Sequence, residues 1–255
     1  MEVIAIEAAR LAYWPAENGG ADLARLKSDL ARGGFGELVV FNGTATGSQG
    51  FAALRADGLG LIAFRGTQAN EFRDIRQDIT TFPEHWPEAP GLVHQGFAEA
   101  AQDLQTQLDE WLALTAHRRK RLLMCGHSLG AAIATLHALR VHPTRLITIG
   151  SPRVGDQVFA AAFAKSGIDY KRIVDFEDIV TRVPPSHSPF RFQHVGRAEF
   201  IDRDGAIQAD PAPALVDANV EAGRLVASVL RLAVGGLSRE FSDHAPVNYL
   251  RAYVG

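Results

Sequence analysis

The sequence contains 255 residues, 47% of them hydrophobic, and its formal net charge is −3. A chain of this length and composition can bury a full hydrophobic core, which excludes an intrinsically disordered protein and a small disulfide-stabilised scaffold. Because the charge balance is slightly acidic, the sequence offers no basic surface for nucleic acid, and we expect no nucleic-acid partner.

The first part of the chain is expected to form two helices and then three strands. The helices are IEAARLAYWP (6–15) and ADLARLKSDLARGG (21–34), and the final Gly-Gly gives the second helix a stop signal. Three β-rich runs follow at 37–42, 50–57 and 58–66, separated by turns that contain Gly and Asn. Strands so close together predict an antiparallel meander at one edge of a sheet.

From residue 92 onward, helices alternate with short apolar runs. We expect helices at 95–117, 129–142 and 156–167 and strands at 121–126, 145–150 and 170–176. Because these strands lack polar alternation and a helix separates each from the next, they predict a parallel sheet covered on both faces. A hairpin is expected at 198–210, around Asp204-Gly205. The chain is expected to be one α/β domain over residues 1–255.

The segment EAGRLVASVLRLAVGGL, residues 221–237, is predicted to be an amphipathic helix. Its apolar residues Leu225, Val226, Val229 and Leu232 recur at helical spacing, with arginines off that face. We favour packing of this face on the protein's own core over docking on a membrane or a partner. No run of apolar residues is long enough to predict a membrane span.

The motif Gly126-His127-Ser128-Leu129-Gly130 lies between an expected strand and an expected helix. Gly-x-Ser-x-Gly is weak as an isolated motif, but this setting is typical of a nucleophile elbow. In such an elbow, small residues two before and two after the serine permit a sharp turn that raises Oγ above the sheet. We therefore interpret Ser128 as a nucleophile, with a simple turn residue as the alternative.

Two backbone donors are candidates for an oxyanion hole. A serine nucleophile needs a base for its proton and donors that face the oxyanion formed during attack. The N–H of Leu129 lies at a helix N-terminus, where the helix dipole favours negative charge. Thr67 follows the strand that ends in Phe-Arg-Gly, and its N–H and hydroxyl are the second candidate donors. An ordinary turn at the end of the strand is the alternative for Thr67.

The acid is sought after the serine, because in enzymes with this elbow the chain order is serine, acid, histidine. The stretch RIVDFEDIVTRVPP places Asp175, Glu177 and Asp178 at the end of a parallel strand, where catalytic groups collect. Asp175 belongs to the strand pattern. We therefore choose Asp178, in the loop just beyond, and keep Glu177 in reserve.

Three histidines follow the acid. His187 lies in a proline-rich loop, His194 lies inside an expected strand, and His244 follows the last long helix and precedes an apolar run that can anchor it. We choose His244 as the base, with a structural histidine as the alternative. With Ser128 and Asp178 it predicts hydrolysis through an acyl-enzyme, for which we expect no metal and no organic cofactor.

Six blocks of the sequence resemble the class 3 lipases of the α/β-hydrolase superfamily. The blocks are AFRGT (63–67), VHQGF (93–97), GHSLGAA (126–132), TIGSPRVGD (148–156), EDIVTRVPP (177–185) and DHAPVNYL (243–250), and they follow the family's order. The resemblance implies an α/β-hydrolase fold, a triad of Ser128, Asp178 and His244, and an oxyanion hole of Thr67 and Leu129.

The resemblance also implies a short helical lid just after the first oxyanion residue, at 67–82. There, Phe72, Ile75, Ile79 and Phe82 recur every three or four residues and give one apolar face, suited to closing over the acyl site. A surface helix is the alternative. The implied substrate is a small-molecule or lipid ester such as an acylglycerol, with transient contact to a lipid interface and no obligate protein partner.

Two other functions compete with ester hydrolysis. A catalytically silent hydrolase fold would act as a binding module, but it has no physical need to keep serine, acid and histidine in order. An acyltransferase would form the same acyl-enzyme and exclude water.

The first residues and the cysteine content bear on location. The opening MEVIAIEAARLAYWP has no basic region or cleavage pattern of a signal peptide, and the only cysteine is Cys125. We therefore expect a cytoplasmic protein, although a mature secreted enzyme with a new methionine would look the same.

Overall fold

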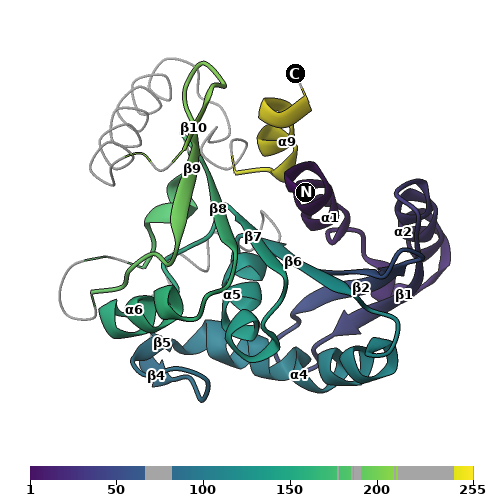
Figure 1. Ribbon diagram of the computed structural model, residues 1–255, viewed down its shortest axis with the longest axis horizontal. Helices are drawn as coiled ribbons and strands as arrows, with labels where there is room; N and C mark the ends of the chain where they lie inside the picture. The colour runs from purple at the N-terminus through teal and green to yellow at the C-terminus, as the bar shows by residue number, and fades with distance from the viewer. Residues whose placement is uncertain are drawn as a thin grey trace.

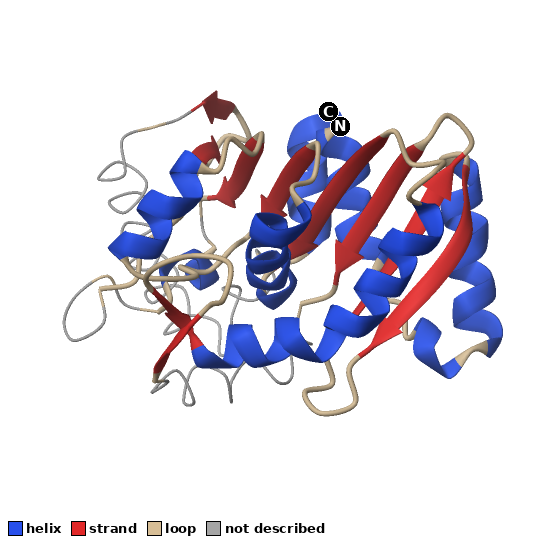
Figure 2. Cartoon of the chain, turned by 60° about the horizontal axis from the view of Figure 1, so that its bottom comes forward, coloured by secondary structure: helices blue, strands red, loops and turns tan. Residues whose placement is uncertain are grey.

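The chain is built around one mixed β-sheet, which helices cover on both faces (Figures 1 and 2). The computed structural model describes residues 1–66, 82–176, 178–184, 186, 191–209, 211 and 244–254. Within these ranges, the sheet has eight strands in the order β1-β2-β3-β6-β7-β8-β9-β10. The strands are β1 (Phe35–Asn42), β2 (Gln49–Arg55), β3 (Leu59–Phe64), β6 (Arg121–His127), β7 (Arg145–Ile149), β8 (Tyr170–Asp175), β9 (Arg197–Ile201) and β10 (Ile207–Ala209).

The strand directions confirm the expected organisation. Strands β3, β6, β7, β8 and β9 pair in parallel, while β1, β2 and β3 form an antiparallel meander at one edge. At the other edge, β9 and β10 form the expected hairpin, in which Ile207 pairs with Ile201. The central parallel strands therefore place all their carboxyl ends at one edge of the sheet, where catalytic groups collect in α/β folds.

Within the described residues, six α-helices make the two outer layers (Figure 1). Helices α1 (Glu2–Leu11), α2 (Gly20–Arg32) and α9 (Pro246–Val254) cover one face, and helices α4 (Gln95–Thr115), α5 (Leu129–Val141) and α6 (Gln157–Lys165) cover the other. Two short 3-10 helices, η1 (Ala16–Asn18) and η2 (Ile179–Arg182), lie in connections. Helix α1 packs beside α9, so the described ends of the chain are neighbours (Figure 2).

The central strands β3, β6 and β7 lack polar alternation because both of their faces are buried. In β6, Leu123 and Cys125 join the core under α1 and α9, while Leu122 and Met124 join the core under α4 and α5. Strand β3 is divided in the same way, and all of its residues are buried. Burial of apolar area on both sides is the main force that holds this three-layer arrangement together.

Two parts of the fold differ from the expectations. Strands β4 (Pro83–His85) and β5 (Leu92–His94) form a separate two-stranded sheet that the sequence did not predict. The expectation that His194 lies inside a strand was wrong, since only the neighbouring Gln193 makes an isolated bridge, to Gly155. The stretch around His194 makes no continuous ladder with any strand that the structure describes, so it is an irregular connection leading to β9.

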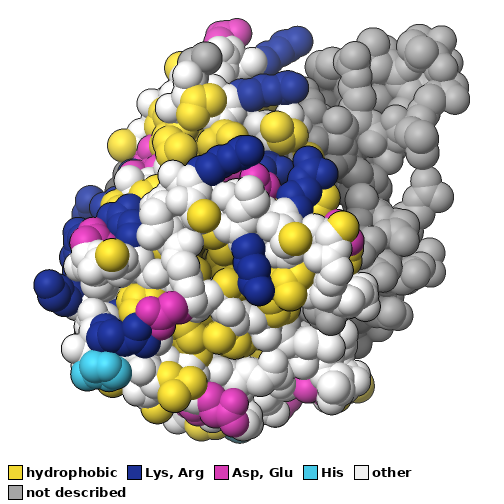
Figure 3. Space-filling view, turned by 90° about the vertical axis from the view of Figure 1, so that its right-hand side faces the viewer, with side chains coloured by type: hydrophobic (Ala, Val, Ile, Leu, Met, Phe, Trp, Pro, Cys, Tyr) yellow, Lys and Arg dark blue, Asp and Glu magenta, His cyan; other side chains and the backbone are white. Residues whose placement is uncertain are grey.

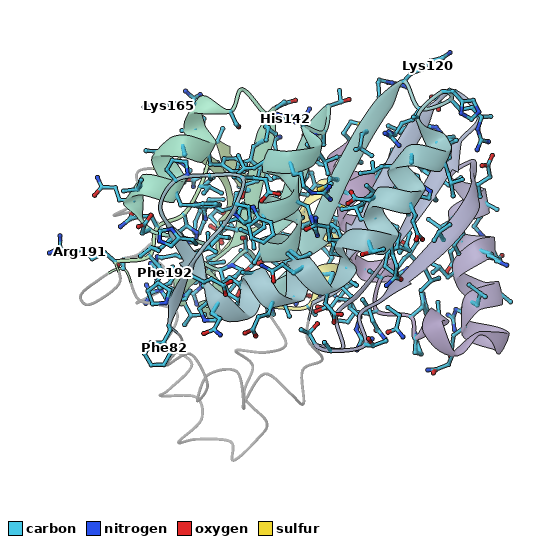
Figure 4. The ribbon with its side chains drawn as sticks, turned by 90° about the horizontal axis from the view of Figure 1, so that it is seen from below. Phe82, Lys120, His142, Lys165, Arg191 and Phe192 are labelled. Atoms are coloured by element: carbon cyan, nitrogen blue, oxygen red, sulfur yellow. The ribbon has the colours of Figure 1, made fainter. Side chains whose placement is uncertain are left out.

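Charged residues of both signs intermix on the face that carries α2 and β1 (Figure 3). Arg118 pairs with Glu37, and Arg121 pairs with Asp57 at 3.1 Å. Lys120, His142 and Lys165, which precede strands β6, β7 and β8, lie along one edge of the molecule in Figure 4, and Phe82 lies at the opposite edge. The carboxyl ends of the parallel strands therefore point toward the Phe82 side.

Several expectations lie outside the described residues. These are the second oxyanion donor Thr67, the lid with Phe72, Ile75 and Ile79, the reserve acid Glu177, His187, and the helix at 221–237. Only the last lid residue, Phe82, is described, and 74% of it is exposed. Among the helices that the structure describes, none has the length and apolar character needed to cross a membrane.

Candidate active site

Ser128 occupies the sharp turn between β6 and α5. Its backbone has φ 59° and ψ −125°, a left-handed conformation that a residue with a side chain rarely adopts. Such a conformation costs about 1–3 kcal/mol and persists only where the surrounding structure enforces it. Here the Ser128 N–H donates to the carbonyl of Ile149 at 3.0 Å, and the residue is almost fully buried. The geometry is that of a nucleophile elbow.

The two glycines of the motif make this turn sterically feasible. A Cβ atom on Gly126 would collide with the backbone of Gly130 and lie 2.8 Å from the Ala131 nitrogen. A Cβ atom on Gly130 would collide with the carbonyl of Phe64 and lie 2.8 Å from the carbonyl carbon of Arg65. Helix α5 can therefore approach β3 and β6 closely only because both positions lack a side chain.

The N-terminus of α5 and the end of β3 meet at Ser128. Leu129 is the first residue of α5, and the first N–H groups of a helix have no partner within it, so they are available to an anion. Gly66, directly before Thr67, is close enough that a Cβ atom there would lie 2.8 Å from Ser128 Cβ. The described part of the chain thus reaches the side of the serine at Gly66.

Asp178 and His244 form a buried pair on the same side of the sheet. His244 Nδ1 lies 2.7 Å from Asp178 Oδ2, and neither residue is more than 4% exposed. The Asp178 carboxylate also accepts hydrogen bonds from the Val180 N–H at 2.9 Å and from the Tyr249 hydroxyl. Because an ionised carboxylate can only accept, the proton of neutral His244 resides on Nδ1. This leaves Nε2 as the basic atom.

The loop after β7 brings this pair next to the serine. A Cβ atom on Gly150 would lie 2.6 Å from Asp178 Oδ2 and 2.9 Å from His244 Cε1. The preceding residue, Ile149, accepts the hydrogen bond from Ser128. The buried Ser128 Oγ makes no hydrogen bond with any residue that the structure describes. Catalytic hydrogen bonds are often formed only once substrate binds, so the lack of a hydrogen bond at Ser128 Oγ is compatible with nucleophilic catalysis.

Two residues near the pair were given no role in the sequence analysis. Tyr249 reaches Asp178 from α9. Arg153 is buried and donates to the carbonyls of Arg182 and, at 3.0 Å, Pro184, which follow Asp178 in the chain. Tyr249 belongs to the sequence block DHAPVNYL, and Arg153 belongs to TIGSPRVGD. Their place in these two blocks was the only sign in the sequence that they lie near the site.

His194 and Asp175, which the sequence analysis considered as base and acid but did not choose, lie outside the Asp178–His244 pair. The imidazole of His194 hydrogen-bonds to the backbone of Thr181, and burial, reinforced by Arg172 and Arg153, holds its pKa well below the ordinary value. His194 therefore supports the segment after Asp178 as a neutral group. Asp175 ends β8 and is only partly buried. No group of metal-ligating side chains occurs among the residues that the structure describes.

Comparison with known proteins finds one matching family and several similar proteins. Residues 61–188, 128 of the 255, match the model of the family described as Lipase (class 3). A lipase of Rhizomucor miehei is 34% identical over 155 residues, which cover 55% of this chain and 41% of that relative. The solved triacylglyceride lipase of Rhizomucor miehei superimposes with a TM-score of 0.65 and 26% identity, covering 78% of this chain and 79% of that one. The chain spans less than half the length of the curated relative.

The expectation of a cytoplasmic location was wrong. A relative from Fusarium solani, 34% identical over 117 residues covering 43% of this chain and 34% of the relative, is a secreted mono- and diacylglycerol lipase. The expectation relied on the single cysteine and on the pattern of the first residues. Since secretory leaders are removed on maturation, that pattern carries no information on location.

Proposed function

Because this chain belongs to the class 3 lipase family and has an α/β-hydrolase fold, we propose that it is a serine hydrolase that cleaves carboxylic esters of lipids. The observation that carries the proposal is the buried Asp178–His244 pair, which lies beside a serine held in the elbow conformation. This combination supplies a nucleophile, a base and an orienting acid without any further group.

In the proposed reaction, Ser128 Oγ attacks the ester carbonyl and its proton passes to His244 Nε2. Asp178 holds the imidazole in the correct tautomer and stabilises the imidazolium. The N–H of Leu129, with Thr67 as the second donor, stabilises the oxyanion. The imidazolium then protonates the leaving alcohol. Water, activated by the same histidine, hydrolyses the acyl-enzyme and restores Ser128.

The proposed substrates are acylglycerols or other lipid esters. One solved structure of similar fold is a triacylglyceride lipase, and the Fusarium solani relative is named a mono- and diacylglycerol lipase. We further propose transient contact with a lipid interface, because the proposed substrates are lipid esters. Phe82, which is largely exposed, lies on the side of the carboxyl ends of the parallel strands.

The proposal is tested with p-nitrophenyl esters from acetate to palmitate, below and above the concentration at which each substrate aggregates. The wild type should turn over the series and Ser128→Ala should be inactive. Ser166→Ala, a matched serine at the end of α6, should retain activity. A folded wild type that turns over no ester would favour a silent binding module. Ester formation with added alcohols in excess of hydrolysis would favour an acyltransferase.

A further inference from the structure

Tyr13 and His127 are linked by a hydrogen bond on the buried side of the elbow. Tyr13 follows helix α1, and its hydroxyl lies 2.7 Å from His127 Nδ1, although 114 residues separate them in sequence. The two rings also meet edge to face, with centroids 5.7 Å apart. His127 directly precedes the elbow serine and is 1% exposed. The N-terminal layer is therefore in direct contact with the elbow.

The other nitrogen of His127 contacts the segment that carries the base. His127 Nε2 lies 2.6 Å from the carbonyl oxygen of His244, and the centroids of the two imidazole rings are 4.3 Å apart. A carbonyl oxygen can only accept, so Nε2 of His127 carries the proton and donates it. In the neutral imidazole, Nδ1 must then accept, and the Tyr13 hydroxyl must donate to it.

A third link reaches the end of β3. The backbone of Gly66 hydrogen-bonds to the Tyr13 hydroxyl, which has already given its own proton to His127, so the Gly66 N–H is the donor. Gly66 immediately precedes Thr67. The chain of hydrogen bonds therefore runs in one direction, from Gly66 to Tyr13, to His127 and finally to the carbonyl of His244.

We propose that Tyr13 and His127 are positioning residues. Through this chain of hydrogen bonds they fix the relative positions of three backbone segments: the end of β3 at Gly66, the nucleophile elbow at Ser128 and the segment that carries His244. The inference rests on the proposed function, because it assigns the roles of Ser128, His244 and the Gly66–Thr67 segment to one reaction. None of the three triad side chains takes part in the chain, so it acts on them only through the backbone segments that carry them.

The protonation states of Tyr13 and His127 match these hydrogen-bond directions. Burial, with a smaller contribution from the neighbouring His244, holds the pKa of His127 well below its ordinary value, so the imidazole stays neutral. Burial raises the pKa of Tyr13, so its hydroxyl keeps the proton that it donates. A protonated His127 could not accept at Nδ1 and would break the chain.

The test compares Tyr13→Phe with Tyr170→Phe. Tyr170 is the matched control, because its buried hydroxyl also bonds to another side chain, that of Thr148 at 2.7 Å, within the core under α4, α5 and α6. Tyr13→Phe should lower kcat about 10- to 100-fold with KM nearly unchanged, because small displacements of reacting groups are costly. Labelling of Ser128 by a fluorophosphonate should slow to the same extent. Tyr170→Phe should lower the melting temperature similarly but keep kcat.

A double-mutant cycle tests whether the chain acts as a unit. His127→Leu removes both nitrogens, and Tyr13→Phe added to it should cause little further loss of kcat, whereas independent effects would multiply. Wild-type kcat in Tyr13→Phe, or equal losses of kcat in Tyr13→Phe and Tyr170→Phe, would overturn the inference while leaving the proposed function intact. A wild type with neither turnover nor labelling of Ser128 would overturn both.

Discussion

His244 Nδ1 lies 2.7 Å from Asp178 Oδ2, although the two residues are 66 positions apart in the chain. The contact exists because Asp178 is the N-cap of η2, just beyond β8, and α9 begins two residues after His244. Tyr249, on α9, donates to the same carboxylate oxygen and ties the helix to it. Three donors therefore satisfy the buried Asp178 carboxylate and fix its orientation.

Replacing this carboxylate should disable the proposed base. Asp178→Asn should lower kcat about 10³- to 10⁴-fold, because an amide no longer fixes His244 in the tautomer with a basic Nε2. Steady-state hydrolysis of p-nitrophenyl butyrate measures the loss. Glu177→Gln, which removes the neighbouring reserve carboxylate, should stay within a few-fold of the wild type. The opposite ranking would show that the acid was assigned to the wrong residue.

The close approach of α5 to β3 should tolerate no side chain at Gly130. In Gly130→Ala the new methyl group would meet the backbone of Phe64 and Arg65, which cannot move aside as a side chain can. We expect a loss of about 1–3 kcal/mol in the free energy of unfolding and a large loss of activity. Gly36→Ala is the control, because a Cβ atom there has open space. Urea denaturation of both variants measures the difference, and equal stabilities would contradict the steric account.

Replacing Arg153 by lysine should lower both the stability and kcat. Its guanidinium serves two carbonyls at once, those of Arg182 and Pro184, and its backbone N–H donates to Val183 at 2.8 Å. A lysine lacks the fork of donors, so Arg153→Lys should lose about 1–3 kcal/mol of stability and lower kcat by loosening the Asp178 segment. Arg121→Lys, at an exposed ion pair with Asp57, is the control. If both variants matched the wild type in thermal unfolding and kcat, Arg153 would have no such role.

Glu2 should stabilise the protein above about pH 4.5 and stop doing so in acid. Burial acts to raise its pKa, but hydrogen bonds from Lys171 and from the backbone outweigh that effect and lower the pKa from 4.5 to about 2. Its carboxylate also pairs with Arg145 at 2.9 Å, which ties α1 to β7 and β8. A lowered folded-state pKa gives stability that is fully present above the unfolded value and is lost as the pH falls through the folded value.

Glu2→Gln should therefore lower the melting temperature at neutral pH by about 2–4 °C, which corresponds to about 1 kcal/mol. The difference from the wild type should shrink as the pH is lowered from 4.5 toward 2. Glu7→Gln, which removes the ion pair with Arg10 within the same helix, should have a smaller effect. A constant difference between Glu2→Gln and the wild type across this pH range would show that the carboxylate charge is not responsible.

Local features were predictable from the sequence. The strand, the elbow glycines and helix α5 are consecutive, so their periodicity and the small residues at 126 and 130 indicated the turn at Ser128 directly. The alternation of helices with strands that lack polar alternation also predicted the parallel sheet. Strand ends were less certain: β1 begins at Phe35, two residues earlier than expected, because Phe35 pairs with Arg55 and packs in the core under α2.

Contacts between distant segments were not predictable from residue patterns. Nothing in the periodicity around Tyr13 or His127 indicates that the two meet, because their contact depends on how α1 is laid across the sheet. The hairpin of β4 and β5 has strands of only three residues, too short to give an alternating pattern. Asp178 and His244 could be chosen among the candidate acids and bases only by chain position and by resemblance, because the two residues meet only after folding.

The most direct test of the account is to find which residue is phosphorylated when an organophosphate inactivates the protein. The wild type is treated with diethyl p-nitrophenyl phosphate, residual hydrolysis is followed, and the modified peptide is identified by mass spectrometry. We predict that activity disappears as one equivalent is incorporated, on Ser128, and that Ser128→Ala incorporates none. Loss of activity with Ser128 unmodified, or modification at another residue in step with inactivation, would contradict the assignment of Ser128 as the nucleophile.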